Sequence, residues 1–271
     1  MIHLSLIIES IVVISLIALL SIKLRVLDVL GTITAAIIGI IIYFTIGRIG
    51  IVALCIFMFI SGLTTRIGYE YKKSIGAAES KTGIRGWRNV LGNGLIAIFF
   101  SIYSILTFNS SSLPLVGFIG SVSAVFADTL ATEVGLLYRG PTRLIIGLKQ
   151  TRPGTPGGVT TYGYAGAFFS TLILTASLAP FLINNKSLTL TKLALITLVS
   201  GIGGTTIDSI VGQLLQAVYR CPICHSITED YIHCNTRCEK IKGISYINNH
   251  VVNIICSAFG GLTALVLYNT F

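Results

Sequence analysis

The chain has 271 residues, of which 53% are hydrophobic and only 11% are charged, and its formal net charge is +9. Soluble domains carry about 25% charged residues, so this composition excludes an ordinary soluble protein. A helix needs about 20 apolar residues to cross a bilayer. The chain contains several continuous apolar runs of about that length, which predict an all-α polytopic transmembrane bundle. They exclude a membrane barrel, whose strands alternate apolar and polar residues.

The apolar runs divide the chain into eight candidate spans that form a single membrane domain covering residues 1–271. The first run is too long for the apolar part of a signal peptide and lacks a small-residue cleavage site, so we treat it as a span. In chain order the expected spans cover residues 4–22, 27–46, 49–64, 89–107, 113–138, 158–183, 193–217 and 249–268.

Basic residues are distributed unevenly between the loops. Of the 19 Lys and Arg residues, sixteen fall in the odd-numbered loops, and the even-numbered loops hold only Arg48, Lys186 and Lys192. Cytoplasmic loops of membrane proteins carry the basic excess. We therefore expect an integral membrane protein, in the plasma membrane if the cell is prokaryotic, with both termini outside and the polar loops in the cytoplasm. The same rule accounts for the net charge, so we expect no nucleic-acid partner.

The fifth expected span contains two acids in the sequence "AVFADTLATEVG" (124–135). A carboxylate in hydrocarbon is costly, so an intramembrane acid indicates a functional site. On a regular helix Asp128 and Thr132 share a face, whereas Glu133 points about 140° away from Asp128. The alternatives are hydrogen bonds that hold helices together or a divalent-cation site. We favour Mg²⁺, bound by Asp128, Glu133 and the later Asp208.

The loop "TRPGTPGGVTTYG" (151–163) follows this span. Its glycines permit backbone conformations that other residues resist, and successive N–H groups in such a turn form an anion nest. The helix that follows, from about residue 159, adds its positive end. The alternative is an ordinary turn; a Walker A loop is excluded, because no Lys follows the glycines. We expect a phosphate cradle made by Gly154, Thr155, Gly157 and Gly158, with Arg143, Lys149 and Arg152 beside it.

The seventh expected span contains "GGTTIDSIVGQLLQ" (203–216). Asp208, Gly212 and Gln216 recur every four residues and form a polar, small-residue stripe on a helix. Glycine in such a stripe permits close approach of another helix or a ligand.

The loop after this span is rich in cysteine and histidine, in the sequence "CPICHSITEDYIHCNTRC" (221–238). Its C-x₂-C and C-x₃-C pairs suit a tetrahedral Zn²⁺ or an iron–sulfur cluster. The alternatives are free thiols, a disulfide or a catalytic site; a cytoplasmic location disfavours disulfides. We favour a small structural zinc site within residues 219–243, with ligands drawn from Cys221, Cys224, His225, His233, Cys234 and Cys238. Cys55 and Cys256 lie in apolar runs and are expected to pack in the bundle.

Seven segments together resemble the domain-of-unknown-function 92 family of polytopic membrane proteins, which includes the transmembrane protein 19 group. The resemblance extends from about residue 85 to 255, and one position departs from the usual pattern: His250 stands where the family usually has Asp. The matching segments are "GWRNVLGNG" (86–94), "FADTLATEVG" (126–135), "GPTRLI" (140–145), "PGTPGGVTTYG" (153–163), "DSIVGQLLQ" (208–216), "CPIC" (221–224) and "INNHVVN" (247–253).

The family includes a plant phytyl-phosphate kinase and is distantly similar to CTP-dependent dolichol kinases. The resemblance implies a Mg²⁺-dependent kinase that transfers a phosphoryl group from CTP to an isoprenoid monophosphate, whose tail lies between the spans. It implies catalytic roles for Asp128 and Asp208, with Lys149 and Arg143, and nucleotide-binding roles for Asn93, Ser209, Asn249 and Asn253. The alternatives are a transporter of an ion or small anion, a CTP-dependent lipid cytidylyltransferase, and a scaffold whose Cys/His loop binds a partner.

Overall fold

The computed structural model describes residues 4–78, 82–107, 111–183 and 187–271. Lys81 and Lys186, which entered the count of basic residues, lie outside this part of the chain. The described residues form α1 (Leu4–Lys23), α2 (Val29–Thr45), α3 (Arg48–Arg66), α4 (Tyr69–Ser74), α5 (Trp87–Leu106), α6 (Leu113–Leu137), α7 (Thr161–Leu178), the short 3₁₀ helix η1 (Ala179–Leu182), α8 (Leu190–Leu214) and α9 (Asn249–Thr270).

The all-α membrane class is confirmed. Each of the eight expected spans contains a helix, and within the described residues seven helices are long and apolar enough to cross a membrane. The exception is α2, whose 17 apolar residues fall short of the ~20 that span a bilayer without tilt or thinning.

Several helix ends differ from prediction by a few residues, and two of these differences affect residues discussed above. The sixth span begins at Thr161 rather than residue 158, because Thr160 caps the helix by accepting a hydrogen bond from the N–H of Gly163 at 2.9 Å. The seventh span ends at Leu214. Gln216 therefore lies beyond the helix, and the expected polar stripe does not extend to it.

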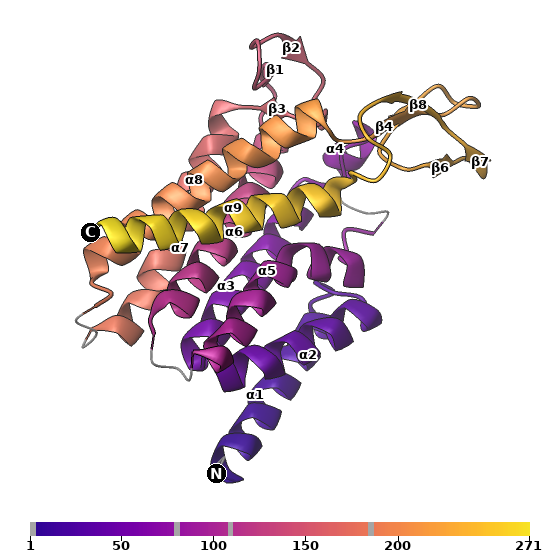
Figure 1. Ribbon diagram of the computed structural model, residues 1–271. Coiled ribbons are helices and arrows are strands. Elements are labelled where there is room, and N and C mark those ends of the chain that lie inside the picture. Colours follow the sequence, from indigo (N-terminus) through magenta and orange to yellow (C-terminus); the bar gives the residue numbers. More distant parts are fainter. Residues whose placement is uncertain (1–3, 79–81, 108–110, 184–186) are drawn as a thin grey trace.

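Helix α6 forms the centre of the bundle (Figure 1). In its most apolar 18-residue stretch 78% of the residues are buried, against 17% in α1. Small residues allow α9 to approach α6 closely: a Cβ added at Gly120 would lie 2.5 Å from the carbonyl oxygen of Gly260. Most of α6 is therefore covered by other helices, and Glu133 is buried, whereas Asp128 is partly buried and Thr132 is exposed.

Short strands lie at one end of the bundle (Figure 1). One small antiparallel sheet has the order β2-β1-β3, and a second has the order β5-β4-β8, with a separate β6–β7 hairpin. The two chain termini lie away from this end. The strands are β1 (Thr142–Leu144), β2 (Gln150–Thr151), β3 (Gly158–Val159), β4 (Val218–Arg220), β5 (Ile227–Thr228), β6 (Ile232–His233), β7 (Thr236–Arg237) and β8 (Glu239–Lys242).

Candidate active site

A polar cavity of about 140 Å³ lies between α6, α8, the glycine loop and the starts of α7 and α9. One water needs only roughly 10–15 Å³ by the same kind of measure, so the cavity accommodates a larger polar ligand. Helices α6, α8 and α9 and the stretch that leads into α7 all contribute to its lining. The lining includes Asp128, Thr132 and Gly135 of α6, residues 153–160 with Gly163 and Tyr164 at the start of α7, Thr205, Asp208 and Ser209 of α8, and Asn249 of α9, together with Thr142, Gln216 and Glu229.

Three carboxylates meet at this cavity. The structure brings Asp128 and Asp208 together, and it adds Glu229 from the segment between β5 and β6. Asp128 and Glu229 both lie within electrostatic range of Asp208. Neighbouring carboxylates repel one another unless a cation or protons compensate them, so the cluster favours a bound cation. Sequence reasoning missed Glu229, because it lies in a polar loop outside every span.

Buried polar atoms without a hydrogen-bond partner also gather here. They are Thr142 Oγ1, Thr205 Oγ1, Asp208 Oδ2 and Gln216 Nε2, and all four residues line the cavity. Nearly all buried polar groups in proteins are hydrogen-bonded, to protein or to water. Four such atoms around one cavity therefore point to a polar ligand that bonds to them.

The glycine loop is held against α8 by its conformation. Gly157 has φ +83°, and a Cβ there would lie 2.8 Å from the carbonyl oxygen of Ser209. The predicted nest is only partly free, since the N–H groups of Thr155 and Gly158 donate within the loop, at 3.2 and 2.8 Å, to the carbonyls of Arg152 and Thr155. The loop therefore has a fixed shape and lines the cavity with backbone.

Two helix N-termini border the same cavity. Thr160 caps α7 and lines the cavity, and Asn249 is the first residue of α9, which Asn248 caps through a hydrogen bond to the N–H of Val251. The N-terminus of a helix carries partial positive charge and favours anions. The cavity thus combines carboxylates, which suit a cation, with helix ends, which suit phosphate.

The predicted basic residues are not brought to the cavity. Arg143, Lys149 and Arg152 are exposed, on or next to the β1–β2 strands, and Arg143 donates to the carbonyl oxygen of Leu148 at 3.0 Å. Among the residues described as lining the cavity, none is Lys or Arg. Antiparallel pairing of residues 142–144 with 150–151 projects these side chains from the bundle, so the structure places them beside the site rather than in it.

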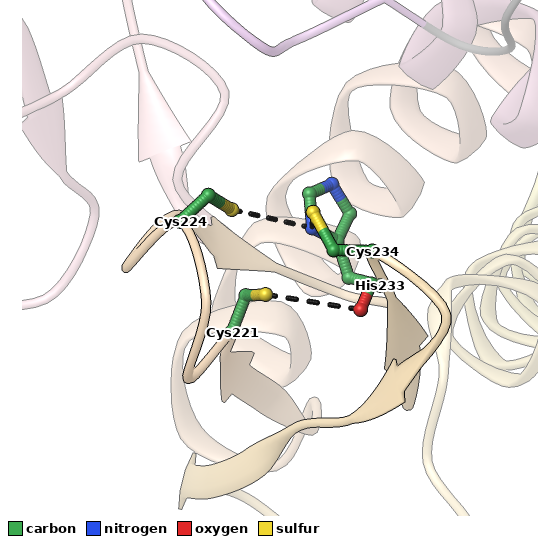
Figure 2. Close-up of side chains that lie close together, drawn as sticks. All are labelled: Cys221, Cys224, His233 and Cys234. Carbon is green, nitrogen blue, oxygen red and sulfur yellow. Dashed lines mark hydrogen bonds between the residues drawn. The ribbon is translucent and has the colours of Figure 1, made fainter.

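The Cys/His segment folds into two turns that face each other (Figure 2). Cys221, Cys224, His233 and Cys234 present ligand atoms that all lie within 4.8 Å of one another. The Ser226 hydroxyl, 2.9 Å from Cys224 Sγ, lowers the pKa of that thiol to about 6. Of the six predicted ligands, His225 and Cys238 are not in this group.

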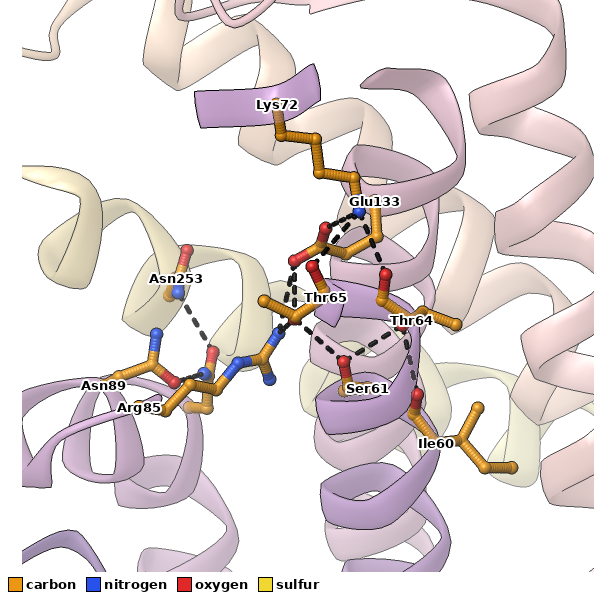
Figure 3. A network of polar contacts seen from close by, with 10 residues as sticks. Ile60, Ser61, Thr64, Thr65, Lys72, Arg85, Asn89, Glu133 and Asn253 are labelled. Atoms are coloured by element: carbon orange, nitrogen blue, oxygen red, sulfur yellow. Dashed lines mark hydrogen bonds and ion pairs between the residues drawn. The ribbon is translucent and has the colours of Figure 1, made fainter. Parts of the chain in front are cut away.

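Glu133, which was predicted to bind Mg²⁺ with Asp128 and Asp208, is not among the described lining residues of the cavity. Its carboxylate accepts hydrogen bonds from Lys72 Nζ and Thr65 Oγ1, each at 2.6 Å, and Arg85 lies 3.7 Å away (Figure 3). The charged side chains are at least 94% buried. Because both oxygens are engaged inside the protein, Glu133 joins α6 to α3 and α4 instead.

A chain of asparagine side chains connects α5 with α9. Asn93 Nδ2 donates to Asn89 Oδ1, and Asn253 Nδ2 donates to Asn93 Oδ1, both at 3.0 Å. Asn253 lies about one helical turn from Asn249 of the cavity. Asn93 and Asn253 therefore stand behind the cavity, whereas Ser209 and Asn249 line it directly. His250 packs against Gly92 of α5 and is absent from the lining residues described.

A second, apolar cavity of about 100 Å³ lies on the other side of α6, among α1, α2, α3 and α5. Most of the residues that line it are apolar. The largest polar residues in the lining are Arg85, Asn89 and Asn93. Arg85 Nε is buried and has no hydrogen-bond partner. The Asn89–Asn93–Asn253 chain leads from these residues toward the polar cavity.

Comparison with known proteins gives relatives over nearly the whole chain. The family model described as "Integral membrane protein DUF92" matches residues 12–261. An uncharacterized membrane protein of Methanocaldococcus jannaschii is 32% identical over 261 residues, covering 96% of this chain and 94% of that protein. Two Arabidopsis thaliana proteins also match: Protein VTE6, chloroplastic, at 27% identity (88% of this chain, 64% of that protein), and Protein PGR at 29% (91% and 90%). No solved structure matches the chain.

Proposed function

Because this chain belongs to the integral membrane protein family DUF92, we propose that it is a membrane-embedded kinase that uses CTP and Mg²⁺ to convert an isoprenoid monophosphate into the diphosphate. One observation carries the proposal: three carboxylates and four unpartnered buried polar atoms share a cavity with a glycine loop and two helix N-termini. The resemblance to a family that includes a phytyl-phosphate kinase supports the reaction class.

Phosphoryl transfer depends mainly on positioning and on charge neutralisation. Asp128, Asp208 and Glu229 would hold Mg²⁺, and the unpartnered Asp208 Oδ2 fits a metal ligand. When bound, Mg²⁺ neutralises charge on the nucleotide phosphates. The backbone of residues 154–158 and the N-terminal ends of α7 and α9 would orient those phosphates, with Ser209 and Asn249 as hydrogen-bonding groups at the cavity wall.

The acceptor needs no dedicated base. A phosphate monoester loses its second proton near pH 6, so its oxygen is already a nucleophile at neutral pH. The isoprenoid tail would lie between the membrane-spanning helices, with its phosphate in the polar cavity beside the nucleotide phosphates. The exposed Arg143, Lys149 and Arg152 would attract the anionic substrates toward this end of the bundle.

The test is a transfer assay on the full chain in detergent, with Mg²⁺, CTP labelled at the γ-phosphate, and phytyl or geranylgeranyl monophosphate. We expect label in the lipid diphosphate and release of CDP. Asp208→Asn should lower the rate by about 10²-fold or more, whereas Asp230→Asn, which removes an exposed carboxylate outside the described lining, should not.

Other products would exclude the kinase. Release of labelled diphosphate with cytidine in the lipid would identify a cytidylyltransferase. Intact CTP with every isoprenoid phosphate tested would contradict both enzymes and favour transport through the carboxylate-lined cavity.

A further inference from the structure

The segment between α8 and α9 has little apolar material to hold it together. Its only cluster of buried hydrophobic residues among those described consists of Ala217, Tyr219, Cys221 and Cys238. Strands β5, β6 and β7 have two residues each. Small units with so few core residues usually need a disulfide or a metal to hold their shape, and all six cysteines of the chain are free thiols.

The first turn has the geometry of a metal knuckle. The N–H of His225 donates to the carbonyl of Cys221, and the N–H of Cys221 donates to the carbonyl of Ser226, both at 3.0 Å. His225 occupies the left-handed position of this turn, with φ 56°, which accounts for its absence from the ligand group.

The second turn is the two-residue loop of the β6–β7 hairpin. His233 pairs with Thr236, and the two loop residues, Cys234 and Asn235, have φ 51° and 56°. Positive φ at both loop positions is characteristic of the tight two-residue hairpin turn. With His225, these are three of the five non-glycine residues with positive φ in the described chain. Such strain persists where the surroundings enforce it, often at ligand sites.

Two of the distances between the ligand atoms are those expected on one tetrahedral ion. With Zn–S near 2.3 Å and Zn–N near 2.0–2.1 Å, a sulfur and a nitrogen on the same tetrahedral zinc lie roughly 3.5 Å apart. His233 Nδ1 lies 3.4 Å from Cys224 Sγ and 3.3 Å from Cys234 Sγ. Cys221 completes a set of three thiols and one imidazole nitrogen, all within 4.8 Å, which is a closed donor set typical of structural zinc.

We propose that Cys221, Cys224, His233 through Nδ1, and Cys234 bind one Zn²⁺ that holds the two turns together. Cys238 packs in the small core beneath the site and is not a ligand. Glu229 lies between the two turns in the chain and reaches the polar cavity. If the proposed kinase site is correct, the zinc ion therefore also fixes the third carboxylate of that site, although zinc binding itself depends on no assumption about the reaction.

The experiment measures zinc in the full chain, purified in detergent without chelator or histidine tag, with no lipid or nucleotide present. We expect about one zinc per chain by elemental analysis. Cys224→Ser, Cys234→Ser and His233→Ala should lose it, whereas the matched controls His225→Ala and Cys238→Ser should keep it. Replacement by Co²⁺ should give the visible thiolate-to-cobalt bands of a tetrahedral site.

A second measurement uses only wild-type protein, so misfolding of a variant cannot account for its result. Wild-type protein treated with a mercurial, which blocks the thiols, should release its zinc to a chromogenic chelator. Wild-type protein without zinc, or zinc retained in Cys224→Ser, would overturn the proposal. Bound iron with visible absorption, in place of zinc, would overturn the proposal and indicate an iron–sulfur centre. Loss of zinc in Cys238→Ser together with its retention in His233→Ala would overturn the proposed ligand set. All of these outcomes are measured as bound metal, with no lipid or nucleotide present, so failure of the zinc proposal and failure of the proposed kinase are distinguishable.

Discussion

Replacing Glu133 by Gln tests the buried charge cluster of Figure 3. Lys72 Nζ lies 2.6 Å and Arg85 Nη2 lies 3.7 Å from the Glu133 carboxylate. At an effective dielectric constant of about 20, Coulomb's law gives attractions of roughly 6 and 4.5 kcal/mol at these distances. Desolvation of the three ions offsets much of this gain, by several kcal/mol per ion.

Glu133→Gln removes both attractions and leaves two buried cations without a counter-charge. We expect a loss of about 3–5 kcal/mol in the free energy of unfolding. Lys72→Met should cost less, because Arg85 still neutralises the carboxylate. The matched control is Glu70→Gln, the same change at an exposed position of α4, which should alter stability by no more than about 0.5 kcal/mol.

The assay is denaturant unfolding in detergent micelles, followed by fluorescence of Trp87, the single tryptophan of the chain. Trp87 begins α5, two residues after Arg85, and so reports on this region. A Glu133→Gln protein as stable as wild type, with its response to Mg²⁺ abolished, would refute the reasoning. It would support the predicted role of Glu133 as a Mg²⁺ ligand.

Three further results are expected. Gly157→Ala should lower transfer activity by about 10²-fold, as small displacements near a reacting centre do, because its Cβ would collide with Gln213; Gly147→Ala, which has the same φ but open space around it, should not. Gly120→Val should destabilise the bundle by about 1–3 kcal/mol or more through overpacking against α9, while Gly94→Ala should be tolerated, with both free energies read from unfolding curves. Chelation of zinc should make residues 216–248 sensitive to protease, and unchanged digestion would contradict a structural role for the ion.

Local patterns were sufficient for the fold class and for part of the site. Apolar runs determine a helical membrane bundle, because hydrocarbon requires every backbone group to be satisfied within its own helix. Because a carboxylate in a membrane span is costly, Asp128 and Asp208 could be identified as candidate site residues. The glycine loop could be identified from its residue types. Each of these inferences depends on a short window of sequence, which is why the amino-acid order alone supported it.

Partners that lie far apart in the chain required the tertiary structure. Helical periodicity shows that Asp128 and Glu133 point in different directions, but not which direction meets α8 and which meets α3. Packing decided that Asp128 faces the polar cavity while Glu133 faces Lys72 and Arg85. It also brought Glu229 to the cavity from a loop outside the spans. Side-chain pairing across a bundle depends on how helices rotate against one another, and no local window of sequence encodes that rotation.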